Sequence, residues 1–226
     1  MRIRWQNELV HLALIAAMFV LAAATWSSAP EQIPVHWNAY GAVDRYGGKF
    51  EGLLLLPLLA LAIYGLFLLV PKLDPGRANY EQFAAAYSTL RIAVTLLLAA
   101  VYALLQLTIH GYAVNIGMVG PMLVGLLFIV IGNLLGKVRP NWAVGIRTPW
   151  TLSSKTSWDK THRVGGRLFI VAGIIMMVTS VLGPPWNLYF GVAMAPFLVV
   201  TSFGYSYWVW RGASDKVPPA GTLPAN

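Results

Sequence analysis

Six long apolar runs constrain this chain more than any other feature. A helix needs about 20 mostly apolar residues to cross the roughly 30 Å hydrocarbon layer of a membrane. Runs of nearly that length, free of Lys, Arg, Asp and Glu, cover residues 9–26, 53–70, 92–109, 117–135, 168–183 and 188–210. The sequence therefore predicts an all-α fold, a polytopic transmembrane helical bundle with six spans.

The composition agrees with a membrane domain. Only 11% of residues are charged and 58% are hydrophobic, whereas soluble domains carry charge on about a quarter of their residues. We expect one membrane domain over residues 1–216 and a disordered tail, rich in Pro and Ala, over residues 217–226. The absence of cysteine excludes disulfides, thiolate metal sites and a cysteine nucleophile.

The first run also resembles a signal peptide, because Arg2 and Arg4 precede it and small residues follow its apolar part. The run is long for a signal peptide, however, and Glu8 lies where positive charge is usual. We therefore expect a retained helix.

The basic residues predict the orientation. With a cytoplasmic N-terminus, outside segments hold only Arg45 and Lys49, and inside segments hold the other fourteen Lys and Arg residues, Arg91 among them. Such a bias is the positive-inside pattern. It places the N and C termini and the loop at 136–167 in the cytoplasm, and the loop at 27–52 outside. The net charge of +8 is then explained by the Lys and Arg residues that collect in the cytoplasmic loops of a protein embedded in the lipid bilayer. We do not expect nucleic acid as a partner.

The outer loop concentrates turn formers, aromatics and ionisable groups. Gly41 suits a turn because glycine tolerates a positive φ, and asparagine before it favours the same turn. The loop is either a structured cap over the bundle or a binding surface for an extracytoplasmic ligand. No metal site is expected, since one His and one Asp fall short of a ligand set. The candidate ligand-binding residues are His36, Asn38, Asp44, Arg45 and Lys49.

The inner loop has its own local signals. Gly132 and Gly136 form a small-xxx-small pair that lets another helix approach, and Asn133 is expected to hydrogen-bond across helices. Residues 142–146 are expected to be extended, residues 147–149 to form a rigid turn, and a helix to restart near Ser153 or Ser154.

On that restarted helix Trp158 and His162 share one face, while Lys155, Asp159 and Arg163 are spaced for ion pairs. The helix either lies in the lipid headgroups, with its basic face toward anionic lipid, or contributes to a docking surface for a cytoplasmic partner. No residue is expected to be catalytic, because nothing in the spacing pairs His162 with a nucleophile or carboxylate. The candidate partner-binding residues are Asn141, Arg147, Trp150, Trp158, His162 and Arg163.

Together these loops resemble a known family. The inner residues Gly132, Asn133, Lys137, Pro140, Asn141, the run at 145–152, Trp158 and the run at 161–163 resemble the signature of the SdpI family of bacterial immunity proteins against a sporulation-delaying peptide toxin. Pro34, His36, Asn38, Gly41, Asp44 and Lys49 look like the small uncharacterised domain that often precedes it. The resemblance covers roughly residues 1–70 and 125–185.

The resemblance implies a multi-pass protein of the bacterial inner membrane. It would protect against an extracellular toxin, and it would sequester a cytoplasmic repressor when toxin is present. The alternative is a membrane enzyme or a transporter of a small or lipid-linked substrate, although the lack of a mid-span Asp or Glu weakens proton coupling. No cofactor is expected.

Overall fold

The structure, a computed structural model that describes residues 5–38 and 40–217, is mostly helical. Six of the described helices are long and apolar enough to cross a membrane, which confirms the predicted helical bundle and the number of spans. The elements in chain order are α1 (Trp5–Thr25), β1 (Ile33–Trp37), β2 (Val43–Gly47), a π-helix (Phe50–Leu54), α2 (Leu55–Leu73), a 3₁₀ helix (Arg77–Phe83), α3 (Ala84–Ile109), α4 (Ile116–Leu135), α5 (Pro149–Leu152), α6 (Lys155–Leu182) and α7 (Trp186–Arg211).

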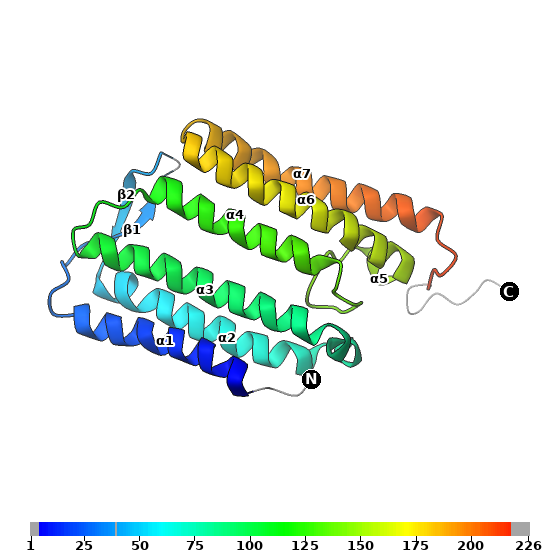
Figure 1. Cartoon of the computed structure of the whole chain (residues 1–226), viewed down its shortest axis with the longest axis horizontal. Helices are drawn as coiled ribbons and strands as arrows, with labels where there is room; N and C mark the ends of the chain where they lie inside the picture. The colour runs from blue at the N-terminus through cyan, green and yellow to red at the C-terminus, as the bar shows by residue number, and fades with distance from the viewer. Residues whose placement is uncertain (1–4, 39, 218–226) are drawn as a thin grey trace.

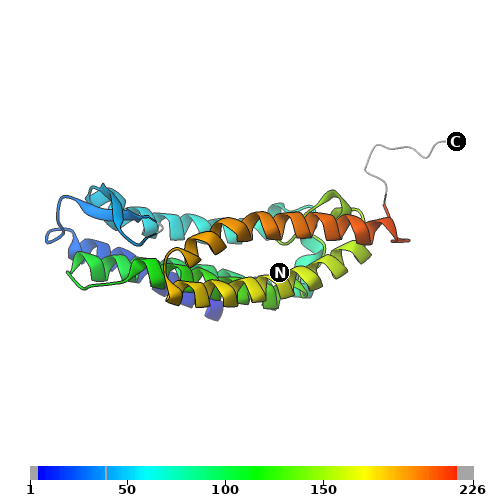
Figure 2. The same ribbon diagram turned by 90° about the horizontal axis from the view of Figure 1, so that it is seen from above.

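The long helices lie lengthwise and alternate in direction (Figure 1). The strands β1 and β2 form a hairpin at one end of the bundle, and α7 finishes at the other end (Figure 2). Helices α1, α2 and α3 pack on one another as one half, helices α4, α6 and α7 as the other, and α3 joins the halves by packing on α4. The loops 74–83 and 136–154 lie at the end opposite the hairpin, which we call the basic end.

Helix α6 merges two elements that the sequence suggested separately. The expected interfacial helix and the fifth span form one continuous helix, because no proline interrupts the sequence from Lys155 to Leu182. The predicted restart is confirmed, since Ser154 is the N-cap and its hydroxyl accepts a hydrogen bond from the amide of Ser157 at 3.1 Å.

Helices α4 and α6 meet along glycines. A Cβ added to Gly132 would lie 2.5 Å from the carbonyl oxygen of Gly166, and one added to Gly173 would lie 2.4 Å from that of Gly125. The predicted close approach at Gly132 is therefore confirmed. The second glycine of α4 at this contact is Gly125 and not Gly136. A Cβ added to Gly136 would make only an ordinary contact at 3.8 Å.

Asn133 does not bridge helices, and that expectation was wrong. Its side chain is exposed and donates to the carbonyl of Ile129 on its own helix, at 2.9 Å. The residue faces away from α6 because the glycine on its N-terminal side, Gly132, occupies the contact face.

Candidate functional site: a cavity beneath the hairpin and a folded signature loop

The outer loop folds into a β-hairpin, a detail that the helical prediction lacked. His36 pairs with Arg45 across the two antiparallel strands. The turn forms where the sequence predicted it: the amide of Gly41 donates to the carbonyl of Asn38 at 2.9 Å, and Gly41 has a φ of +77°. The side chain of Asn38 also accepts from the amides of Tyr40 and Ala42. Asn38 is thus a structural residue of the turn.

Ionisable groups of the hairpin pair with one another. The imidazole of His36 lies 2.5 Å from a carboxylate oxygen of Asp44, and Arg45 donates to Glu51 at 2.6 Å. Asp44 and Arg45 therefore both take part in charged hydrogen bonds that fix the loop. Lys49 pairs with Glu31 at 3.1 Å. These pairs are largely exposed, so they orient the hairpin more than they stabilise it.

A cavity of about 650 Å³ lies beneath the hairpin. His36, Asn38 and Arg45 line it from above, together with Glu51, which the sequence reasoning missed. Helices of both halves form its walls, through apolar residues such as Leu56, Val101, Leu105, Ile116, Met176 and Val192. Such a volume, with apolar walls and few polar groups, is typical of a ligand site.

Small residues keep this cavity open. Gly120 and Gly191 line it, and a Cβ added to either would meet no atom within 4 Å. The hairpin turn closes over the cavity through Gly41, where an added Cβ would lie 3.1 Å from the Cα of Gly117. Lys49 and Asp44 do not line the cavity, although Asp44 reaches it indirectly through His36.

At the basic end the signature loop folds around Asn141. Its buried side chain accepts from the amides of Ala143 and Val144, and donates to the carbonyls of Arg139 and Val144. Residues 142–146 are therefore bent around this side chain, and the expectation of an extended segment was wrong. The sequence could not show that one amide would replace a strand's hydrogen bonds.

The loop also contacts the other half of the bundle through a buried carboxylate, that of Asp74. It accepts from the hydroxyl of Tyr80 at 2.8 Å and from the amide of Trp142 at 3.0 Å. In addition, Asn79 donates to the carbonyl of Pro140 at 2.7 Å. The two halves are thus joined at the basic end by polar contacts whose partners are far apart in the chain and could not be paired from the sequence.

Trp158 and His162 lie inside the bundle, stacked with ring centroids 4.0 Å apart. The imidazole accepts from the amide of Ile146 at 3.0 Å, and its other nitrogen lies 2.8 Å from the carbonyl of Trp158. Gly145, with a φ of +117°, packs so closely that an added Cβ would lie 2.4 Å from this imidazole. Both ring nitrogens are therefore engaged in holding the loop.

The candidate docking residues thus divide into two groups. Asn141, Trp158 and His162 are buried and shape the loop, so they do not face a partner in this conformation. Arg147 and Arg163 are exposed and Trp150 is half-buried against Phe203 and Tyr207. Lys155 forms the expected pair with Asp159 at 2.6 Å, whereas the described residues show no ion pair for Arg163.

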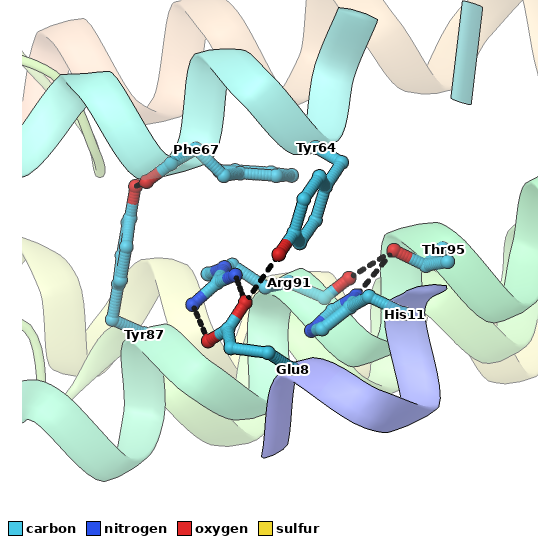
Figure 3. A network of polar contacts seen from close by, with 7 residues as sticks. All are labelled: Glu8, His11, Tyr64, Phe67, Tyr87, Arg91 and Thr95. Carbon is cyan, nitrogen blue, oxygen red and sulfur yellow. Dashed lines mark hydrogen bonds and ion pairs between the residues drawn. The ribbon is translucent and has the colours of Figure 1, made fainter. Parts of the chain in front are cut away.

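Sequence reasoning missed a charged network inside the bundle (Figure 3). Arg91 was counted with the basic residues of the inside segments, but it lies within α3 and is 2% exposed. It donates to both carboxylate oxygens of Glu8 on α1, at 3.0 and 2.6 Å, and Tyr64 on α2 donates to the same carboxylate at 2.8 Å. His11 bonds to Thr95 beside them at 2.8 Å. A signal existed, because neither glycine nor proline separates Ala84 from Arg91.

Comparisons with known proteins match two separate parts of the chain, one that includes the hairpin and one that includes most of the signature loop. Residues 137–205 match the family described as the SdpI/YfhL protein family, and residues 13–61 match a domain of unknown function, DUF1648. An uncharacterized protein of Archaeoglobus fulgidus is 35% identical over 75 residues, which is 33% of this chain and 40% of that relative. No solved structure matches the chain. The bacterial inner membrane stays a prediction, since this relative is archaeal.

Proposed function

We propose that this chain, a membrane protein that carries an SdpI/YfhL family domain preceded by DUF1648, is a binding and signalling protein that protects a cell against an apolar peptide toxin. The cavity beneath the hairpin is the proposed toxin site. The observation that carries this proposal is the cavity itself, about 650 Å³ with mostly apolar walls and three predicted loop residues at its rim.

The cavity suits part of a membrane-active peptide. Its volume is within the usual range for ligand pockets, roughly 300–1,000 Å³, so it accommodates a few apolar side chains rather than a whole peptide. Its rim offers a guanidinium, a carboxylate and an imidazole, those of Arg45, Glu51 and His36. These can exchange their mutual pairs for polar groups of a peptide backbone.

The signalling part of the proposal rests on the opposite end of the molecule. Arg147 and Arg163 are exposed there, and Trp142, whose carbonyl accepts a hydrogen bond from Arg147, is 56% exposed. A basic surface with an exposed tryptophan suits an acidic surface on a cytoplasmic repressor. The long helices connect this surface to the cavity, so that toxin binding at one end can bias the other.

Filling the cavity tests the toxin site. Gly120→Leu and Gly191→Leu place a side chain in open space within it, so both should fold and lose protection. A loss of about 1.4 kcal/mol of binding free energy weakens affinity tenfold. We therefore expect the toxin concentration that cells survive to fall by at least about tenfold. Gly65→Leu and Gly204→Leu are the matched controls, because they also meet open space but lie outside the cavity.

The same cells separate protection from signalling. His36→Ala and Asp44→Ala should lower protection, whereas Arg147→Ala should abolish recruitment of a cytoplasmic partner and leave much of the protection intact. Protein amounts are matched by blotting. The proposal is wrong if the cavity and control variants protect equally well, and the division of labour is wrong if every substitution lowers protein abundance and both activities together.

The same cavity also supports the alternative function, a membrane enzyme or a transporter of a lipid-linked substrate. Purified protein in liposomes distinguishes the two. The binding proposal predicts saturable toxin binding with neither turnover nor net transport. Turnover that is lost in Gly120→Leu but retained in Gly65→Leu would favour the alternative instead.

A further inference from the structure

A second recess lies between α6 and α7 at the basic end, far from the hairpin. It encloses about 490 Å³ and is lined by Thr156, Lys160, Trp208, Val209, Arg211 and Gly212. Its two cations come from different helices: Lys160 from the second turn of α6, and Arg211 from the last residue of α7. The proposed toxin cavity and its signalling do not use this recess.

Neither cation is neutralised within the described part of the chain. No ion pair joins Lys160 or Arg211 to a carboxylate there. Asp159 pairs with Lys155 at 2.6 Å, and Asp215 accepts from the hydroxyl of Ser154 at 2.7 Å and from the amide of Thr156, at the edge of the recess, at 2.8 Å. Arg211 is held over the ring of Tyr207, with 5.9 Å between guanidinium carbon and ring centroid. Two cations that line one recess without an ion-pair partner are suited to a divalent or monovalent anion such as a phosphate group.

The surroundings of the recess are those of a lipid rather than of a dissolved anion. Trp208 is 70% exposed at its edge, and tryptophan prefers the headgroup level of a membrane. On α7 before Trp208, toward the middle of the helix, Val200 is 69% exposed and Phe203 is 47% exposed. These residues give acyl chains an apolar surface. Basic pockets between membrane helices are sites of this kind for anionic headgroups.

We propose that this recess binds the phosphate of an anionic phospholipid, with Lys160 and Arg211 as its ligands and Trp208 packed against its glycerol region. The lipid would join the ends of α6 and α7. Because each cation near an anionic headgroup contributes on the order of 1 kcal/mol, removal of both should weaken lipid binding about 30-fold.

The test uses the full chain in detergent, titrated with phosphatidylglycerol and followed by native mass spectrometry and thermal unfolding. Phosphatidylcholine is the neutral lipid, and inorganic phosphate is the soluble anion. The test variant is Lys160→Gln with Arg211→Gln. The matched control is Lys137→Gln with Arg139→Gln, which removes two positive charges from the same end of the bundle but from outside the recess. Arg211→Gln alone serves if the double variant does not fold.

We expect phosphatidylglycerol to bind and to raise the melting temperature of the wild type and of the control, and the test variant to lose about 30-fold in affinity. Equal losses in both double variants would show that diffuse surface charge attracts the lipid, which overturns the proposal. Unchanged binding in the test variant would also overturn it. If inorganic phosphate stabilises the wild type as well as phosphatidylglycerol does, the site takes a soluble anion and the assignment to a lipid is wrong.

Discussion

Among single residues, Glu8 and Arg91 form a buried ion pair that joins α1 to α3 in the first half of the bundle. The two residues are 83 positions apart, and their side chains are 4% and 2% exposed. Their charges cannot be solvated by water there, so each must be balanced by the other. Tyr64 completes the arrangement by donating to the carboxylate, and α1, α2 and α3 thereby meet at one polar point (Figure 3).

Glu8→Gln should destabilise the protein by about 3–5 kcal/mol, because it leaves Arg91 buried without a counter-charge. Thermal or denaturant unfolding in detergent measures the loss. Lys155→Gln is the control, since it breaks an exposed pair whose contribution is no more than about 0.5 kcal/mol. Double replacement, Glu8→Gln with Arg91→Gln, should recover part of the loss; equal effects of Glu8→Gln and the control would contradict this account.

The carboxyl of Asp215 should make the attachment of residues 213–217 to α6 depend on pH. The hydroxyl of Ser154 and the amide of Thr156 donate to its carboxylate and hold its pKa below the usual range. A lowered folded pKa contributes stability that is present above the unfolded value, about 3.9, and is lost as the pH falls through the folded value. The contacts of residues 213–217 with α6 should therefore weaken progressively as the pH falls below about 4.

The susceptibility of the amides of that segment to hydrogen exchange, compared between pH 6 and pH 3 relative to an unstructured peptide at each pH, checks this expectation. Asp215→Ala should give at pH 6 the susceptibility that the wild type shows at pH 3. An equal response of Asp215→Ala and wild type to pH would mean that another group holds the segment. Residue 217, where the disordered tail was predicted to begin, is itself held by a bond from its amide to the carbonyl of Ser153 at 2.8 Å; residues 218–226 lie outside the described part.

Among the elements, the α4 and α6 pair has the closest packing. Gly125 faces Gly173 and Gly132 faces Gly166, so the contacts repeat at intervals of seven residues on both antiparallel helices. A spacing of seven residues is close to two helical turns, so the two glycines of each helix lie on the same face. The carbonyl oxygens approach the opposite glycines because no side chain intervenes.

Gly132→Leu should destabilise the protein by about 3 kcal/mol or more, since it forces a side chain against the backbone of Gly166 and exceeds the usual 1–3 kcal/mol of overpacking. Melting in detergent measures the effect. Gly65→Leu is the control on α2, where an added Cβ meets nothing within 4 Å. A normal melting temperature for Gly132→Leu would mean that α4 and α6 are farther apart than the structure shows.

In the molecule as a whole, the basic residues are distributed unequally between the two ends. Apart from the buried Arg91, the described Lys and Arg residues of the predicted inside segments lie toward the basic end, and Arg45 and Lys49 lie at the hairpin end. The positive-inside bias predicts that the basic end is cytoplasmic. Reporter fusions after Lys49 and after Lys155 should therefore report opposite sides of the membrane. Two fusions on one side would contradict this topology.

The sequence by itself determined the features that depend on neighbouring residues. The number of spans follows from the length and composition of each run, and the Asn38 turn, the Ser154 cap and the close approach at Gly132 follow from local chemistry. Of the five outer-loop residues predicted to bind a ligand, three line the cavity, namely His36, Asn38 and Arg45. The volume beneath them was not predictable, because its walls come from five helices that are separate in the sequence.

The tertiary structure alone decided which faces meet. Membrane helices are apolar on nearly every side, so their hydropathy does not distinguish a buried face from one that contacts lipid. For that reason Arg91 was taken for a loop residue although it lies against Glu8, and Trp158 and His162 were taken for a docking surface although the signature loop covers them. The partners of Asp74 and Arg91 are fixed by how α1, α3 and the signature loop pack, which is information that no single stretch of the chain contains.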